Sequence, residues 1–469
     1  MSELVRQSNF EDRKLSGHRR KSFKYAYMTS IAASISAMCM LSNPLQLFVI
    51  KMGASEFYLG LLSFFAAYAG FFSILSLTTI ETSGKRVVML RGWLITAFIM
   101  LPMVFLPFIA KSLPQSSKVI LWIVIGLVAL RGIFDGYGST AWFPILQDNV
   151  PARITGKFFA RFRLVWQSCL LVLVWGMSYY LGNDATYEKF AVIFAIGTLC
   201  LFSRSITAYK MSELPPKPPQ KQQNTFRRIL NLLKYKQLRT YICYLVAINI
   251  GLFMPVPFQI KMLKNFDYSD GYIMLATSMI QLASIITLRF WGKISDRYGN
   301  RAVFSICVIG NMITISLWIL VDINPFSKIF IFVLYFLWGM FTAGNGIAQT
   351  RHMLHSTPRN NQAAIVLITI ISSISLALAP LIGGILLSAT KGLSIKSGAI
   401  NLNNYHILFL LSALLFTIPY NLRRKLRITK EDSTNYVMSS ILRPLRQAIG
   451  SHIRVVPPRL FQKDDNSDN

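Results

Sequence analysis

The segment Gly292-Lys293-Ile294-Ser295-Asp296-Arg297-Tyr298-Gly299-Asn300-Arg301 lies between two long apolar runs and is the part of the sequence that decides our fold prediction. A fainter copy, Glu81-Thr82-Ser83-Gly84-Lys85-Arg86, also lies between two apolar runs, 215 residues earlier. In both copies an acidic residue is followed by Gly and Arg at the same spacing. A charged loop repeated at matching places predicts a chain built from two related halves.

The apolar runs themselves predict a membrane protein. Of the 469 residues, 53% are hydrophobic and only 14% are charged, whereas soluble domains carry about 25% charged residues. Many runs have the roughly 20 residues needed to cross a bilayer. We expect an all-α membrane protein with twelve transmembrane helices in two pseudo-symmetric six-helix bundles. The predicted spans are 26–50, 57–80, 92–110, 118–141, 163–182, 189–209, 241–262, 271–291, 302–321, 328–350, 363–388 and 404–421.

The strong positive charge is best explained by membrane topology. The formal net charge is +30, which in a soluble protein would indicate a nucleic-acid partner. If the N-terminus lies inside the cell, most Lys and Arg residues fall in inner segments, as the positive-inside rule requires. We therefore expect both termini to be cytoplasmic. The plasma (bacterial inner) membrane is what the resemblance of residues 142–151 to a loop of bacterial membrane proteins implies. The basic loops are expected to contact anionic lipid headgroups, with no nucleic-acid partner.

Composition along the chain predicts five regions. They are a basic cytoplasmic tail (1–24), a first bundle (25–210), a cytoplasmic linker (211–240), a second bundle (241–422) and a cytoplasmic C-terminal tail (423–469). Within the linker, residues 226–236 alternate apolar and basic residues at helical spacing. This pattern predicts an amphipathic helix on the inner leaflet.

One carboxylate falls well inside a predicted span. Asp135 lies in the fourth span, and Arg131 is four residues earlier, on the same helical face. Ionisable residues in a membrane are costly and usually functional, so we expect an Arg131–Asp135 pair that faces the central cavity. Asp135 could carry a coupling proton, or Arg131 could bind an anionic substrate. The alternative is a structural clamp.

Polar residues beside prolines form the second candidate group. Interrupted helices at matching positions of two halves point to a binding site, although prolines can simply kink helices. The first span is interrupted near Pro44, and the seventh near Pro255 and Pro257. The polar substrate or coupling candidates are Asn43, Gln46, Asn249 and Gln259, together with Asn345 in the tenth span.

The sequence contains no signature of an enzyme. It has no phosphate-binding Gly-x-x-x-x-Gly-Lys-Ser/Thr loop and no nucleophile motif, and a single core carboxylate cannot form a catalytic cluster. The five cysteines have no metal-ligand spacing, and we read His352 and His355 as surface histidines. No cofactor or metal is expected.

Residues 292–301 resemble the loop signature of the major facilitator superfamily, Gly-x-x-x-Asp-Arg-x-Gly-x-Arg. Residues 81–86 resemble the degenerate first-half copy of that signature, with Leu77 where the first Gly would stand. The resemblance implies a charge network that holds the cytoplasmic side closed. The gating roles that it implies fall on Glu81, Arg86, Gly292, Asp296, Arg297, Gly299 and Arg301.

The sequence departs from the drug antiporters of that superfamily. Their Gly-Pro-x-x-Gly-Gly string is missing from the fifth span, and a similar string, residues 379–384, occurs in the eleventh. We expect a secondary active transporter that moves a small solute by alternating access, coupled to H⁺ or another cation such as Na⁺. The alternatives are an uncoupled facilitator, or a membrane receptor or scaffold on a transporter fold.

Overall fold

The computed structural model describes residues 2–150, 155–213, 232–322, 324–356, 362–392, 394–397 and 400–426. Within these ranges, twelve helical segments are long and apolar enough to cross a membrane. The predicted all-α class and the number of spans are therefore confirmed. The spans near 189–209 and 404–421 correspond to Tyr187–Tyr209 and Asn404–Lys425.

The first bundle contains six spans, several of them broken into shorter pieces. Its elements are α1 (Ser2–Leu41), α2 (Asn43–Lys51), α3 (Glu56–Ala67), η1 (Tyr68–Ser76), α4 (Leu77–Ser83), α5 (Lys85–Met100), η2 (Leu101–Val104), α6 (Leu106–Ser112), η3 (Pro114–Ser116), α7 (Ser117–Ser139), α8 (Trp142–Asn149), α9 (Thr155–Leu181) and α10 (Tyr187–Tyr209).

The second bundle repeats this arrangement. Its elements are α12 (Lys236–Phe253), α13 (Val256–Asn265), α14 (Asp270–Tyr298), α15 (Asn300–Leu317), η5 (Trp318–Leu320), α16 (Pro325–Ser356), α17 (Gln362–Ala389), β1 (Ser394–Ser397), β2 (Ile400–Asn403), α18 (Asn404–Leu415), α19 (Thr417–Leu422) and η6 (Arg423–Lys425). The antiparallel β1–β2 hairpin, with Ser394 opposite Asn403, was not expected from the sequence.

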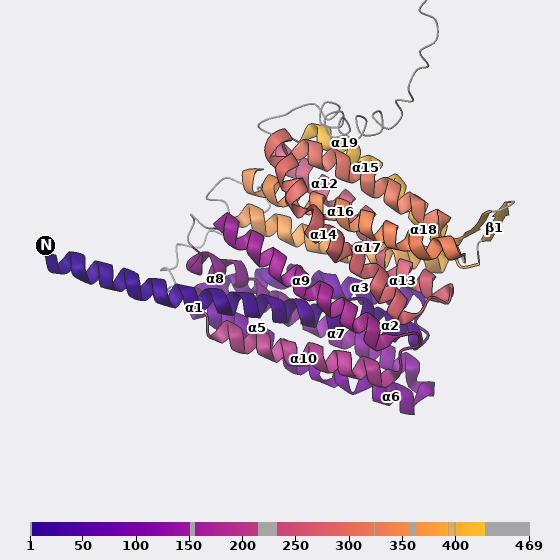
Figure 1. Cartoon of the computed structure of the whole chain (residues 1–469), viewed down its shortest axis with the longest axis horizontal. Coiled ribbons are helices and arrows are strands. Elements are labelled where there is room, and N and C mark those ends of the chain that lie inside the picture. Colours follow the sequence, from indigo (N-terminus) through magenta and orange to yellow (C-terminus); the bar gives the residue numbers. More distant parts are fainter. Residues whose placement is uncertain are drawn as a thin grey trace, which may run out of the picture.

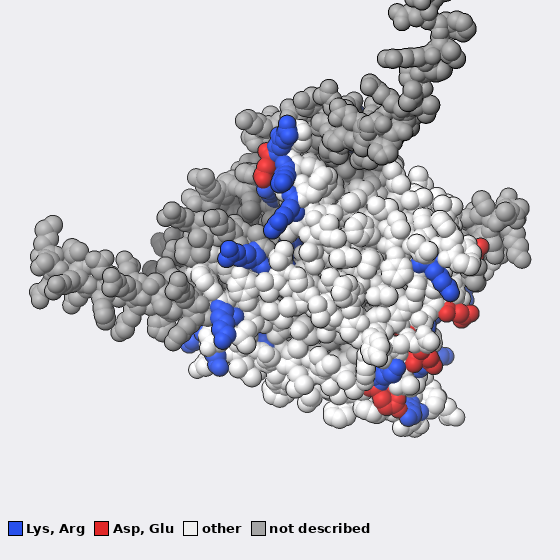
Figure 2. All heavy atoms as spheres, in the orientation of Figure 1, with Lys and Arg blue, Asp and Glu red and all other residues white. Residues whose placement is uncertain are grey.

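The helices of both bundles run roughly side by side, with the first bundle below the second in Figure 1. We call the end that carries Gly84 and Gly299 the motif side, and the end that carries the β1–β2 hairpin the hairpin side. In the view of Figure 2, Lys and Arg predominate at the motif side, whereas acidic and basic residues mix at the hairpin side. Residues 226–231 of the predicted linker helix and most of the C-terminal tail lie outside the described residues. Residues 233–235 form a turn before α12 rather than a continuation of that helix.

The two loops that carry the repeated motif have the same geometry. Gly84 and Gly299 both have positive φ, +89° and +80°, with ψ of 160° and 168°. This region is essentially restricted to glycine. Arg86 donates to the carbonyl of Tyr209, and Arg301 to that of Arg424, each at 3.5 Å. The acceptors are 215 residues apart, like the arginines, so the repeat extends to the last helix of each bundle.

Among the described residues, the bundles meet mainly where α17 packs against α3 and η1, where α9 packs against α14, and where α13 packs against α2 and α3. Small residues allow the first contact, because a Cβ built on Gly60 would lie 2.7 Å from the carbonyl oxygen of Pro380 and 3.2 Å from the Cα of Gly384. The residues 379–384 that set this chain apart from drug antiporters therefore form a contact between the bundles.

Polar contacts strengthen the junction toward the hairpin side. Tyr405 donates to Glu56 at 2.9 Å, and Lys261 donates to the carbonyl of Ala54 at 3.0 Å. The backbone amide of Gly271 donates to Gly182 at 2.7 Å. These bonds tie the bundles together at the hairpin side.

Candidate functional site

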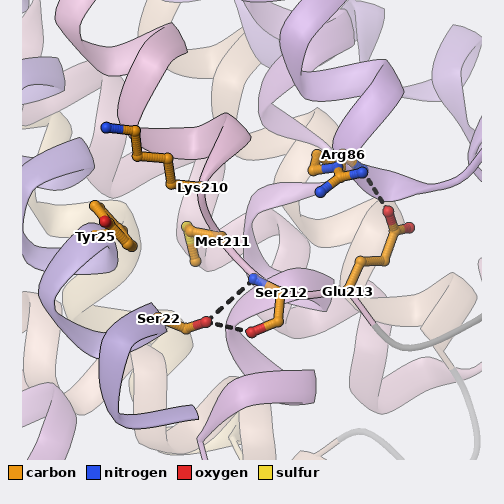
Figure 3. A pocket seen from close by; sticks show the side chains of 7 residues that line it. All are labelled: Ser22, Tyr25, Arg86, Lys210, Met211, Ser212 and Glu213. Atoms are coloured by element: carbon orange, nitrogen blue, oxygen red, sulfur yellow. Dashed lines mark hydrogen bonds between the residues drawn. The ribbon is translucent and has the colours of Figure 1, made fainter. Parts of the chain in front are cut away.

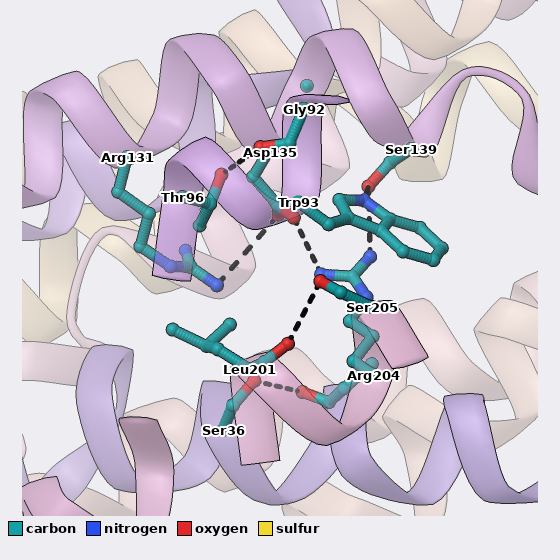
Figure 4. Close-up of polar contacts among 12 residues, drawn as sticks. Ser36, Gly92, Trp93, Thr96, Arg131, Asp135, Ser139, Leu201, Arg204 and Ser205 are labelled. Atoms are coloured by element: carbon teal, nitrogen blue, oxygen red, sulfur yellow. Dashed lines mark hydrogen bonds and ion pairs between the residues drawn. The ribbon is translucent and has the colours of Figure 1, made fainter. Parts of the chain in front are cut away.

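A buried charge cluster lies inside the first bundle, where α5, α7 and α10 meet (Figure 4). An Asp135 carboxylate oxygen is 2.6 Å from an Arg204 nitrogen and the other is 3.8 Å from Arg131. Arg204 also donates to Ser139 at 3.1 Å, and its guanidinium lies 3.7 Å from the centre of the Trp93 ring. The carboxylate is thus held by two cations in a site whose side chains are 5% to 16% exposed.

Glycines bring α5 and α7 close enough to form this site. A Cβ on Gly92 of α5 would lie 2.7 Å from the Cα of Gly138 in α7, and one on Gly138 would press against Trp93. The indole nitrogen of Trp93 donates to Ser139 at 3.3 Å. The packing that glycine permits therefore positions both the ring and the hydroxyl that surround Arg204.

The predicted Arg131–Asp135 ion pair is present, but Arg204 is the nearer partner. All the contacts of the carboxylate named above belong to the first bundle, and that the pair faces the central cavity stays a prediction. Helical spacing could not identify Arg204, since it lies 69 positions from Asp135 and reaches it only because α5 packs against both α10 and α7.

The predicted interruptions of the first and seventh spans are confirmed. The first span breaks at Ser42, before α2, and the seventh breaks between Phe253 and Val256. Among the polar candidates beside these breaks, Asn43 donates to Thr277 at 2.8 Å and so joins the two bundles. Gln46 is 8% exposed, and its side-chain oxygen has no partner in the described part of the chain.

The other polar candidates lie within the second bundle. Asn249 donates to Ser375 at 2.9 Å and thereby joins α12 to α17. Asn345 accepts from Tyr244 at 3.2 Å, and Gln259 is buried in α13. Asn249 and Asn345 thus serve as interhelical hydrogen-bond partners, and any role in substrate binding remains a prediction.

Next to Gly299, the acidic residue of the motif has a partner that the sequence did not reveal. Asp296 accepts from Arg351 of α16 at 2.6 Å, and Arg351 also donates to Ser295 at 3.0 Å. Arg297 lies against the ring of Tyr298, 5.2 Å from its centre. A Cβ on Gly292 would meet nothing within 4 Å, so packing does not require glycine there. The gating roles of these residues remain predictions.

In the first bundle, Glu213 occupies the loop that carries the motif. Its carboxylate accepts from the backbone amides of Lys85 and Arg86, the latter at 3.2 Å. It thus caps the start of α5, where the helix dipole favours negative charge. Glu81, the acidic residue that the motif suggested, has a side chain outside the described part of the structure.

A pocket of ≈ 530 Å³ opens beside this cap (Figure 3). Lys210, Arg86 and Tyr25 line it together with Glu213, and the hydroxyls of Ser22 and Ser212 form a hydrogen bond with each other there. It lies at the motif side, where α5 begins and α10 ends, beside the middle of α1.

The predicted surface position of His352 is wrong. His352 is 5% exposed, and its ring lies 4.5 Å from that of Tyr241. The motif-side end of α16 packs against α12, which buries the histidine. The side chain of His355 is outside the described residues. Within those residues, no group of three or more His, Cys, Asp or Glu is placed to hold a metal ion.

Comparison with known proteins supports the fold and the family. The model of the Major Facilitator Superfamily matches residues 240–418. The solved nucleoside transporter NupG is similar over 87% of this chain and 98% of its own, with 12% identity and a TM-score of 0.62. The xylose transporter XylE from E. coli is similar over 89% of this chain and 100% of its own, with 13% identity and a TM-score of 0.61.

A bacterial homologue of the iron transporter ferroportin, solved in an inward-facing state, covers 87% of this chain and 98% of its own, with 12% identity and a TM-score of 0.60. No curated protein matches the sequence. At these identities the solved structures establish the fold, and the family model adds a sequence match over the second bundle. The second bundle thus matches the model of the Major Facilitator Superfamily, and the chain as a whole has the fold of these solved membrane transporters.

Proposed function

We propose that this transporter moves a small solute by alternating access, as a secondary active transporter coupled to a proton or another cation. The observation that carries the proposal is the asymmetry of the bundle contacts. Tyr405–Glu56 and Lys261–Ala54 join the bundles at the hairpin side. At the motif side, the Arg351–Asp296 pair stays within the second bundle. Among the described residues, these polar contacts between the bundles thus lie at the hairpin side, whereas the ion pair of the motif joins helices of one bundle.

The orientation follows from charge. We assign the motif side to the cytoplasm and the membrane to the plasma membrane, because Lys and Arg gather at that side. The closed hairpin side would then make this an inward-facing conformation, the state in which the ferroportin homologue was solved. The pocket with Arg86 and Lys210 is suited to an anionic lipid headgroup at the inner leaflet.

An accessibility experiment tests the orientation. Thr225→Cys lies in the expected cytoplasmic linker, and Asp184→Cys replaces a side chain that is 82% exposed at the hairpin side. In intact cells, a membrane-impermeant thiol reagent should label the second variant and spare the first. The background is a chain in which the five native cysteines are replaced. Labelling of Thr225→Cys alone would reverse the assignment.

We assign the coupling role to Asp135. Its ion pair with Arg204 links α7 to α10, and the pair is stable only while the carboxylate is charged. Protonation of the carboxylate would remove that attraction and allow the two helices to shift. Binding and release of a proton at Asp135 could therefore alter the packing of the first bundle during the transport cycle.

The test compares two modes of transport in reconstituted vesicles. A solute is first identified by screening sugars, amino acids, nucleosides and organic acids for thermal stabilisation of the purified protein. In folded Asp135→Asn, gradient-driven uptake should be lost while counterflow exchange is retained. If both persist at wild-type rates, the protein is an uncoupled facilitator. If a folded wild-type protein binds none of the solutes, the receptor or scaffold alternative is favoured.

A further inference from the structure

Another arginine of the first bundle, Arg163 of α9, was not among the sequence-based candidates. An α-helix turns about 100° per residue, so Arg163 lies roughly 180° around α9 from Val172, nine residues later. Val172 is an apolar side chain that is 66% exposed, and we take its face of α9 as the one that meets lipid. Arg163 therefore points away from lipid, and its buried Nε has no hydrogen-bond partner among the described residues.

The surroundings of Arg163 lie at the junction of the two bundles. One turn further along α9, the amide nitrogen of Gln167 donates to Ser284 of α14 at 2.9 Å. This bond fixes the depth at which α9 and α14 meet. The side-chain oxygen of Gln167 is buried without a partner among the described residues, and so is that of Gln281, one turn from Ser284 on α14.

The neighbouring helix α16 adds two more unpaired polar atoms at this depth. A Cβ on Gly339 would lie 2.6 Å from the Cα of Ile280, so α16 passes directly beside the turn that carries Gln281. The indole nitrogen of Trp338 and the hydroxyl of Thr342 are buried without partners in the described structure. Buried polar atoms are paired in most proteins, and a set drawn from both bundles indicates a ligand site.

The charge of Arg163 has no counter-ion within reach on these helices. The sequences of α9 and α16 contain no acidic residue, and α14 has none between Asp270 and Asp296, which lie at its two ends. Asp135 is already held by Arg204 and Arg131. The positive charge at the junction is therefore available to a bound anion.

We propose that the transported solute is a small organic anion, with its carboxylate or phosphate bound by Arg163. The planar guanidinium suits both groups. The free oxygens of Gln167 and Gln281 accept from hydroxyl or amine groups of the same solute, so it carries donors as well as a negative charge. This inference rests on the proposed function, and it replaces Arg131 by Arg163 as the anion-binding residue.

The test uses three solutes with one carbon skeleton, at equal ionic strength. Neutral glucose, gluconate and glucose 6-phosphate separate the effect of charge from that of the hydroxyls, and the two anions separate carboxylate from phosphate. Thermal unfolding of the purified full chain is measured against solute concentration. We expect one or both anions to stabilise the wild type more than glucose does.

Variants assign the effect to the arginine. Arg163→Gln should raise the anion concentration needed for stabilisation at least about tenfold. Arg163→Lys keeps the charge but loses the planar guanidinium, so its response should lie between those of the wild type and Arg163→Gln. Gln281→Leu should weaken it from the other bundle. Arg161→Gln is the matched control, since Arg161 is exposed two residues away, and it should respond like the wild type.

Three results would overturn the inference. They are equal stabilisation by glucose, an anion response that survives in folded Arg163→Gln, and the absence of an anion-specific response in the wild type. None of these contradicts alternating access, which the distance measurement at the end of the Discussion tests without any solute.

Discussion

At the scale of single residues, the buried charges of α7 and α10 are the feature with the largest energetic consequence. A buried carboxylate is tolerated only when it is paired, and Asp135 has two cations at unequal distances, 2.6 Å and 3.8 Å. Arg204, which makes the shorter contact, also lies against the Trp93 ring and donates to the Ser139 hydroxyl. Arg204 should therefore contribute more to stability than Arg131.

We predict that Arg204→Met lowers the free energy of unfolding by about 3–5 kcal/mol, because it leaves a buried carboxylate poorly compensated. The coupling energy between positions 135 and 204 in a double-mutant cycle should exceed that between 135 and 131. Thermal unfolding in detergent, read for single and double variants, measures both. Equal couplings would contradict the geometry described above.

The glycines of the repeated loop provide a second prediction at this scale. Gly299→Ala and Gly84→Ala should each destabilise the protein by about 1–3 kcal/mol, since both positions need positive φ. Gly292→Ala is the matched control from the same motif. It lies inside α14 with open space around it, so alanine should be neutral or slightly stabilising. The free energy of unfolding of the three variants is measured. If Gly292→Ala loses as much stability as Gly299→Ala, this explanation is wrong.

At the scale of elements, the side chains around each motif loop connect helices of the same bundle. The exposed Asp296–Arg351 pair links α14 to α16, and Glu213 links α10 to the start of α5. An exposed ion pair contributes little to stability. A role for Asp296 in gating would appear in the rate of conformational change instead.

We predict that Asp296→Asn and Arg351→Gln each reduce turnover more than substrate affinity, with stability changed by less than about 1 kcal/mol. The two variants should have similar effects, because both remove the Asp296–Arg351 ion pair, although Arg351→Gln also removes the bond to Ser295. Initial rates in vesicles as a function of solute concentration separate the two quantities. Unchanged turnover, or a change in affinity alone, would remove Asp296 from the gating mechanism.

How much could be predicted from the sequence depends on whether the partners are local. The twelve spans, the interruptions near Pro44 and Pro255 and the repeated glycine loop follow from hydropathy, proline chemistry and backbone conformation, and the structure confirms them. Helical spacing also predicted the Arg131–Asp135 contact. Each of these features is encoded within a few residues of the chain.

The partners that the sequence did not reveal lie on other helices. Arg204, Arg351 and Glu213 are 55 to 128 residues from the groups that they bind, and only the packing of the bundles brings them together. Arg163 was overlooked for another reason. It lies near the start of its span, where an arginine ordinarily reaches the headgroups, and only the orientation of α9 shows that it faces away from lipid.

At the scale of the whole molecule, the account rests on two bundles that rock about their contacts. At the hairpin side the bundles approach through Gly60 and Gly384. A large side chain at Gly384 would push α3 and α17 apart there. If the bundles move as rigid bodies, opening one side must close the other.

The most direct test is therefore a pair of distances measured by pulsed electron paramagnetic resonance. Spin labels at the exposed positions Ser83 and Lys293 report on the motif side, and labels at Gln115 and Lys328 on the hairpin side. In Gly384→Leu we predict that the hairpin-side distance lengthens while the motif-side distance shortens, relative to wild type. A hairpin side that opens without any closing of the motif side would contradict alternating access between these two bundles.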